Sequence, residues 1–309
     1  MGKPIFHGII PPVSVIFNEK GELDREGTGK VIDFLIDAGV DGLFFLGSNG
    51  EFSQMSVPQR KEVAEFAVEY TRKRVPVLIG TGSSVTAETV ELSRLSESIG
   101  ADGLVVINPY YWQLTEDNLF AHYAEVAQST KLPIVLYNFP DLTGQNLTPE
   151  FVLKLAKAYP NVVGIKDTVD TVGHIRELIL KVKAEIPEFS VFCGYDDHLW
   201  NTLSLGGDGG MSASANFAPE LTIGIYKAFQ EGDYAKGIEL LRKLAYIPLL
   251  YKLDSPFSNV IKEAMRMTGL DVSTHVLAPG RKLSEEKKKD VAEILQQAGL
   301  LAKDASILA

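Results

Sequence analysis

Residues 38–47 read Ala-Gly-Val-Asp-Gly-Leu-Phe-Phe-Leu-Gly, and a related phrase, Ile-Gly-Ala-Asp-Gly-Leu-Val-Val-Ile, occupies residues 99–107. In each phrase a glycine ends a helical stretch and the chain passes directly into an apolar run. The apolar runs show little alternation of polar and apolar residues, which indicates strands buried on both faces, as in parallel sheets. The two phrases therefore predict repeated units of one strand and one helix.

The same alternation continues through the chain, with a repeat of roughly 25 to 35 residues. The predicted strands are 8–17, 42–46, 76–80, 103–107, 133–137, 162–165, 190–193 and 209–212. The predicted helices are 24–38, 58–70, 86–99, 115–129, 148–158, 171–183, 197–205 and 219–231. Eight such pairs fit a closed (β/α)8 TIM barrel, which usually has about 250 residues. A doubly wound open sheet is the alternative, but no Gly-x-Gly-x-x-Gly follows the first strand.

The predicted strands stop before Gly232, and helices are predicted at 233–250, 257–267 and 284–300. We therefore expect two parts. Residues 1–231 form the barrel that carries the active site, and residues 232–309 form a C-terminal helical extension.

Charge and cysteine content limit the partners of the protein. The 309 residues include 30 Lys and Arg against 40 Asp and Glu, a net charge of −10, which disfavours nucleic acid and anionic membrane surfaces. Cys193 is the single cysteine, so an intramolecular disulfide or a cysteine-rich zinc site is excluded. The N-terminal residues have no signal-peptide core, and no apolar run approaches membrane-spanning length. We expect a cytoplasmic protein.

Working residues of such barrels lie at the C-terminal ends of the strands, and Lys166 follows the apolar run 162–165. Burial disfavours a charged ammonium group and favours the neutral amine, which attacks a ketone to form a Schiff base. The alternative is a lysine that reaches solvent or pairs with Asp167. Metalloprotease, P-loop and α/β-hydrolase motifs are all missing from the sequence.

Two further features fall at strand ends. Tyr137 ends the run before that of Lys166, and its phenol could move a proton at a substrate hydroxyl beside an iminium charge. Residues 47–51, Gly-Ser-Asn-Gly-Glu, form a strand-to-helix turn whose backbone N–H groups could bind a carboxylate. The alternatives are a tyrosine of the barrel rim and a tight turn without a ligand. Asp196 and Asp197 are explained more simply as caps of the following helix.

Four motifs resemble, in order and spacing, the signatures of the dihydrodipicolinate synthase/N-acetylneuraminate lyase family of class I aldolases. They are Gly-Ser-Asn-Gly-Glu (47–51), Pro-Tyr-Tyr (109–111), Tyr-Asn-Phe-Pro (137–140) and Gly-Ile-Lys-Asp (164–167). The resemblance extends from about Phe6 to Leu295, and it implies a (β/α)8 barrel that uses pyruvate as the donor.

The resemblance implies a role for each matching residue. Lys166 would form the Schiff base with pyruvate, Tyr137 would be the acid/base, and Ser48 would relay protons. Main-chain N–H groups of Ser48 and Asn49 would hold the pyruvate carboxylate. Tyr111 would belong to the proton relay but reach into the site of a neighbouring subunit, which implies a dimer or a tetramer. Of the two, we expect a homotetramer built as a dimer of dimers. Further substrate contacts are expected from Gly50, Leu142, Gly194, Met211 and Ser212.

Departures from the family pattern bear on the substrate. Synthases of the lysine pathway usually have Arg at the position of Leu142, where it holds the carboxylate of aspartate semialdehyde, and Leu cannot replace a guanidinium. The stretches 108–112, 194–198 and 214–219 look most like bacterial 2-keto-3-deoxy-sugar-acid aldolases. Trp112-Gln113 lacks the Pro-Arg of phosphate-accepting archaeal relatives, which favours an unphosphorylated substrate.

The leading hypothesis is therefore reversible cleavage of a 2-keto-3-deoxy aldonic acid, of gluconate or pentonate type, to pyruvate and a hydroxyaldehyde. No metal or separate cofactor is expected, because the iminium supplies the electrophile. The first alternative is dihydrodipicolinate synthase, and a family dehydratase is the next. An alternative of another class is a catalytically silent barrel that binds a keto acid.

Overall fold

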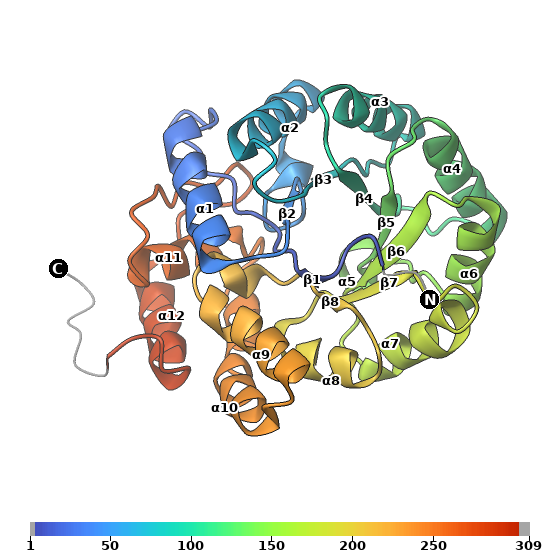
Figure 1. Ribbon diagram of the computed structural model, residues 1–309. Helices are drawn as coiled ribbons and strands as arrows, with labels where there is room; N and C mark the ends of the chain where they lie inside the picture. The colour runs from blue at the N-terminus through green and yellow to red at the C-terminus, as the bar shows by residue number, and fades with distance from the viewer. Residues whose placement is uncertain (1–3, 303–309) are drawn as a thin grey trace.

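A computed structural model describes residues 4–302 and shows a (β/α)8 barrel with a C-terminal helical segment (Figure 1). The fold prediction is confirmed. The strands are β1 (Gly8–Ile9), β2 (Leu43–Phe45), β3 (Val77–Gly80), β4 (Gly103–Ile107), β5 (Ile134–Asn138), β6 (Val162–Asp167), β7 (Ser190–Cys193) and β8 (Gly209–Gly210). All neighbouring pairs are parallel, in the order β1-β8-β7-β6-β5-β4-β3-β2.

Contacts between Pro12 and Phe44 close the barrel between β1 and β2. The two residues form an isolated parallel bridge, and the Val13 amide donates to the Phe44 carbonyl at 2.8 Å. The first strand was predicted over residues 8–17, which is wrong beyond Ile9. Pro11 and Pro12 have no N–H group, so they interrupt the ladder while leaving enough pairing to complete the barrel.

The helices surround the strands (Figure 1). Those of the barrel are α1 (Arg25–Ala38), α2 (Val57–Thr71), α3 (Thr86–Ser98), α4 (Glu116–Gln128), α5 (Pro140–Thr143), α6 (Pro149–Ala158), α7 (Val172–Leu178), α8 (Leu199–Ser204) and α9 (Pro219–Glu231). The C-terminal segment holds α10 (Tyr234–Leu244), α11 (Ser258–Met267) and α12 (Glu285–Gln297), with a 3-10 segment, η5 (Ile247–Lys252), between α10 and α11.

Several predicted boundaries differ from the structure. The helix predicted over 171–183 ends at Leu178 and continues as one π-helical segment, Ile179–Lys183. The helix predicted over 233–250 ends at Leu244, because Pro248 in η5 has no N–H group to continue the ladder. Strand β6 extends through Lys166 and Asp167, so both residues belong to the ladder itself.

The core is continuous between the barrel and the C-terminal segment. Buried side chains of α11, such as Val260 and Ile261, belong to the same apolar cluster as those of the strands. Gly232 caps α9 in the left-handed region, at φ 76°, where glycine is favoured. The division at residues 231 and 232 remains a prediction. Within residues 4–302, no helix has the length and apolarity needed to cross a membrane.

Candidate active site

A cavity of about 480 Å³ lies at the C-terminal ends of the barrel strands. Ser48, Asn49, Tyr137, Leu142, Lys166, Gly194 and Met211 line it, so seven of the predicted site residues come together there. Segments after β2, β5, β6, β7 and β8 all contribute, as expected for an enzyme barrel.

Lys166 lies on the cavity wall with its side chain enclosed by aromatic rings. Its residue is 4% exposed, and Nζ lies 4.2 Å from the centre of the Tyr137 ring and 5.2 Å from that of Phe44. No hydrogen bond or ion pair joins Nζ to any of residues 4–302. The Asp167 pairing considered from the sequence is therefore absent from this part of the chain. Nζ of Lys166 therefore lies at the cavity without a protein partner among the described residues, in a position where a ketone could meet it.

Tyr137 and Lys166 stand on adjacent strands in direct register. They are Cα partners in the β5–β6 ladder, and the Tyr137 hydroxyl lies 3.4 Å from the Ser48 hydroxyl. Either oxygen can be the donor at this distance. A proton could pass between the two hydroxyl groups, which lie beside the Lys166 amine.

The turn at residues 47–51 lies beside these groups with its backbone fixed. The Asn49 amide group donates to the Pro12 carbonyl at 3.0 Å and to the Ser14 hydroxyl at 2.8 Å. Among residues 4–302, no protein acceptor takes the backbone N–H of Ser48 or Asn49. A small anion at this turn could therefore accept both.

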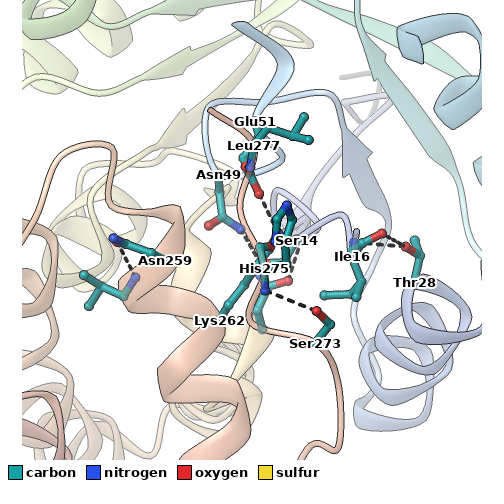
Figure 2. A network of polar contacts seen from close by, with 12 residues as sticks. Ser14, Ile16, Thr28, Asn49, Glu51, Asn259, Lys262, Ser273, His275 and Leu277 are labelled. Carbon is teal, nitrogen blue, oxygen red and sulfur yellow. Dashed lines mark hydrogen bonds and ion pairs between the residues drawn. The ribbon is translucent and has the colours of Figure 1, made fainter. Parts of the chain in front are cut away.

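Glu51, at the end of the turn, connects it to the C-terminal segment (Figure 2). It is a buried residue at φ 60°, and its two carboxylate oxygens accept from Lys262 Nζ at 2.5 Å and from the Leu277 amide at 2.7 Å. Lys262 also donates to the His275 carbonyl at 2.8 Å. Burial lowers the pKa of Lys262, and the charge and hydrogen bond of Glu51 oppose that shift.

Three predicted residues do not line the cavity. Gly50 and Ser212 are buried behind it, and a side chain at Gly50 would meet the Val13 carbonyl at 3.0 Å. Tyr111 lies outside, with the residue 87% exposed and φ at 86°, an unusual value for a residue other than glycine. Its roles in proton relay and in a neighbouring subunit remain predictions.

The outer wall of the cavity is formed by residues that were given no role in the site from the sequence. Asp141, Thr168, Asp170, Tyr195 and Asp197 line it from the barrel loops. The Tyr195 hydroxyl donates to Asp141 at 3.2 Å; burial and this carboxylate raise the pKa of Tyr195 above its usual value. Asp141, Thr168 and Asp170 lie close in sequence to Leu142 and Lys166, and this proximity could have predicted that they line the cavity.

The C-terminal segment supplies the rest of the wall. Pro248, Tyr251, Lys252, Asp254, Ser255 and Phe257 line the cavity, although none belongs to a strand–helix unit. Tyr251 donates to buried Asp196 at 2.5 Å, and burial raises the pKa of Asp196. Within residues 4–302, no group of three His, Cys, Asp or Glu side chains is placed to hold a metal ion.

Comparison with known proteins identifies the class and then the family. The chain is 55% identical to "Putative 2-dehydro-3-deoxy-D-gluconate aldolase YagE" and 54% identical to "Probable 2-dehydro-3-deoxy-D-pentonate aldolase YjhH", both from Escherichia coli (strain K12). Each match covers 96% of this chain and 98% of the relative. The protein is a barrel lyase of the aldolase type. The model of the "Dihydrodipicolinate synthetase family" matches residues 5–298, and the chain belongs to that family.

A solved relative has the same fold. The crystal structure of YagE from E. coli K12 in complex with pyruvate superposes with a TM-score of 0.95, at 55% identity, covering 96% of this chain and 100% of that chain.

Proposed function

We propose that the protein reversibly cleaves a 2-keto-3-deoxy aldonic acid, of gluconate or pentonate type, to pyruvate and a hydroxyaldehyde. The observation that carries the proposal is Lys166, a buried lysine without a counterion in residues 4–302, facing the cavity beside Tyr137. The names of the relatives YagE and YjhH support the substrate class.

The proposed reaction begins when the Lys166 amine attacks the C2 ketone and water leaves, giving an iminium. Tyr137, through Ser48, takes the proton of the C4 hydroxyl. The C3–C4 bond then breaks, its electron pair moves toward the iminium to give an enamine, and the aldehyde departs. Protonation of the enamine at C3 and hydrolysis of the resulting imine release pyruvate and restore the amine. No separate cofactor takes part.

We place the substrate carboxylate at the N–H groups of Ser48 and Asn49. That position is beside Tyr137, because the Ser48 hydroxyl is 3.4 Å from the Tyr137 hydroxyl. Backbone donors bind a carboxylate without an added cation, which suits a chain of net charge −10.

The outer part of the cavity favours a neutral, hydroxylated chain. Its four carboxylates can accept hydrogen bonds from hydroxyl groups, and they outnumber Lys252, the cation of this wall, so a phosphate or a second carboxylate is disfavoured. They belong to Asp141, Asp170, Asp197 and Asp254. Leu142 in this wall also argues against aspartate semialdehyde as the acceptor, so dihydrodipicolinate synthase is the second choice.

Assembly and location complete the proposal. We propose a homotetramer, supported by Tyr111, which holds a positive φ at an 87% exposed position where a partner subunit would enclose it. We also propose a cytoplasmic location, which cell fractionation tests.

The experiment is a reductive trap. The protein is incubated with 2-keto-3-deoxygluconate or with pyruvate, reduced with borohydride, and the modified peptide is mapped. A pyruvate-sized adduct on Lys166 from both compounds is expected, with activity unchanged by EDTA. Lys166→Met should abolish the adduct, whereas Lys252→Met, the control at another lysine of the cavity, should retain it.

Other outcomes separate the alternatives. An adduct from pyruvate alone would move the assignment to another acceptor, beginning with aspartate semialdehyde. No adduct from either compound, with pyruvate binding detected by calorimetry, would leave a silent keto-acid-binding barrel.

A further inference from the structure

Behind Tyr137 and Lys166, a second pair of side chains occupies the other face of the same two strands. Asn138 and Asp167 are the next Cα partners in the β5–β6 register. Successive side chains of a strand point to opposite faces, so this pair points toward the helices when the first pair points into the barrel. Asn138 is 0% and Asp167 1% exposed.

A hydrogen bond joins the second pair directly. Asn138 Nδ2 donates to Asp167 Oδ1 at 2.8 Å. This hydrogen bond therefore joins β5 to β6 at the register position that directly follows the Tyr137–Lys166 pair. A change in this bond would alter the separation of the two side chains that face the cavity.

Both members of the pair are held from outside the barrel. His174 Nδ1, from the first turn of α7, lies 3.0 Å from each oxygen of Asp167, and with its proton on Nδ1 it donates to the carboxylate. Asn138 Oδ1 accepts from the Leu147 amide at 2.9 Å, and Asn138 Nδ2 donates to Asn146 at 2.8 Å. The carboxylate is thus bonded to strand β5 on one side and to α7 on the other.

Burying the Asp167 carboxylate costs free energy that an apolar contact at the same place would not cost. A buried carboxylate requires hydrogen bonds to offset its lost hydration, and apolar side chains of similar volume often stabilise a protein as well as a buried polar pair. What a fully bonded polar cluster adds is a fixed geometry.

We infer that Asn138, Asp167 and His174 form a clamp that positions Lys166 against Tyr137. They are positioning residues, since none of them lines the cavity. The inference rests on the proposed function, because it assigns the clamp to the lysine and phenol of the Schiff-base reaction.

The test compares Asp167→Ala, His174→Phe and His174→Asn. Asn at position 174 retains a side-chain N–H near the position of Nδ1, so it should preserve the bond to Asp167 that Phe removes. Ser93→Ala is the control, because it removes a buried 3.1 Å hydrogen bond to Thr81 beside another strand, far from Lys166 in the ladder.

We expect Asp167→Ala and His174→Phe to lower kcat by about 10- to 100-fold, the order of loss produced by a small misplacement of reacting groups. The rate of borohydride trapping with pyruvate should fall in parallel, while KM changes by less than about threefold. His174→Asn should recover most of kcat. Ser93→Ala should lower only the melting temperature.

Several results would overturn the clamp. One is a folded Asp167→Ala or His174→Phe enzyme with kcat within about twofold of the wild type. Another is an equal loss in Ser93→Ala. Should Asp167→Ala not fold, the Phe and Asn variants at His174 decide the question. A wild-type protein that traps neither compound would instead refute the proposed function and the clamp with it, so the two failures are distinguishable.

Discussion

At the scale of the residue, Lys166 shows which features of the site could be predicted from the sequence and which could not. A lysine at the end of an apolar run was visible in the sequence, and it is buried. Tyr137 was expected beside Lys166, but the Phe44 ring near Nζ was not predictable, because Phe44 belongs to a strand distant in sequence. Aromatic faces attract a cation, so this surrounding would stabilise the iminium that the proposed condensation with a ketone forms.

The Tyr137 hydroxyl can be tested separately from the ring. Tyr137→Phe keeps the aromatic face over Lys166 but removes the acid/base, so kcat should fall by about 10²- to 10⁴-fold while the pyruvate adduct still forms. Steady-state kinetics and trapping measure the two effects. Tyr123→Phe is the control, since Tyr123 is buried outside the cavity with its hydroxyl on the Val106 carbonyl. Unchanged kcat in Tyr137→Phe would refute the assigned role.

Cys193 should be unreactive in the folded protein. It is fully buried, and burial raises the pKa of its thiol to about 12, whereas the thiolate is the reactive form. We expect no reaction with a thiol reagent at pH 8 in buffer and complete reaction in denaturant. Rapid modification of the native protein would show that β7 opens readily.

At the scale of the element, the sequence predicted strands and helices where burial alone determines them. The runs 103–107 and 190–193 match β4 and β7 residue for residue. Boundaries were wrong where a backbone hydrogen bond is missing, as at Pro11 and Pro12 after β1. The short helix α5 was not predicted, because its four residues are too few to show a helical period.

Packing of α4 against α3 should make stability depend on pH. His122 of α4 has a pKa lowered by burial to about 4, from an ordinary value of 6.5, and its Nδ1 lies 2.9 Å from the Thr86 hydroxyl at the start of α3. Because the folded pKa is depressed, the stability is complete above pH 6.5 and is lost as the pH falls from 6.5 through 4. The full loss is about 3 kcal/mol.

Urea unfolding at a series of pH values measures this effect. His122→Gln, which cannot be protonated, should remove this contribution to the dependence of the unfolding free energy on pH between 6.5 and 4. Equal slopes in His122→Gln and the wild type would contradict the prediction.

At the scale of the whole molecule, the C-terminal segment completes the site. Sequence patterns placed the strand ends together because barrel topology does so, but no pattern related Pro248, Tyr251, Lys252, Asp254 or Ser255 to the cavity. The contact between Glu51 and Lys262 was equally hidden, because a lysine in an amphipathic helix is ordinarily exposed. Both features depend on how the C-terminal segment packs against the barrel, which the local sequence pattern does not show.

Breaking the buried ion pair should destabilise the whole protein. Lys262→Met leaves the Glu51 carboxylate buried without its cation, which costs about 3 to 5 kcal/mol. The double variant that adds Glu51→Gln to Lys262→Met should recover part of the lost unfolding free energy. Lys154→Met, at an exposed pair with Glu116 2.8 Å apart, should change the free energy of unfolding far less, because solvent screens an exposed pair. Denaturant unfolding compares them, and equal losses at the two lysines would disprove the importance of the buried pair.

The pairing of Glu51 also has a consequence for synthesis on the ribosome. Its two partners lie 211 and 226 residues later in the chain. At about 5 to 20 residues per second, the first of them leaves the ribosome roughly 10 to 40 seconds after Glu51 does. Throughout that interval the turn at residues 47–51 lacks the buried cation of Lys262. The nascent barrel therefore completes the turn between β2 and α2 only after the C-terminal segment has been synthesised.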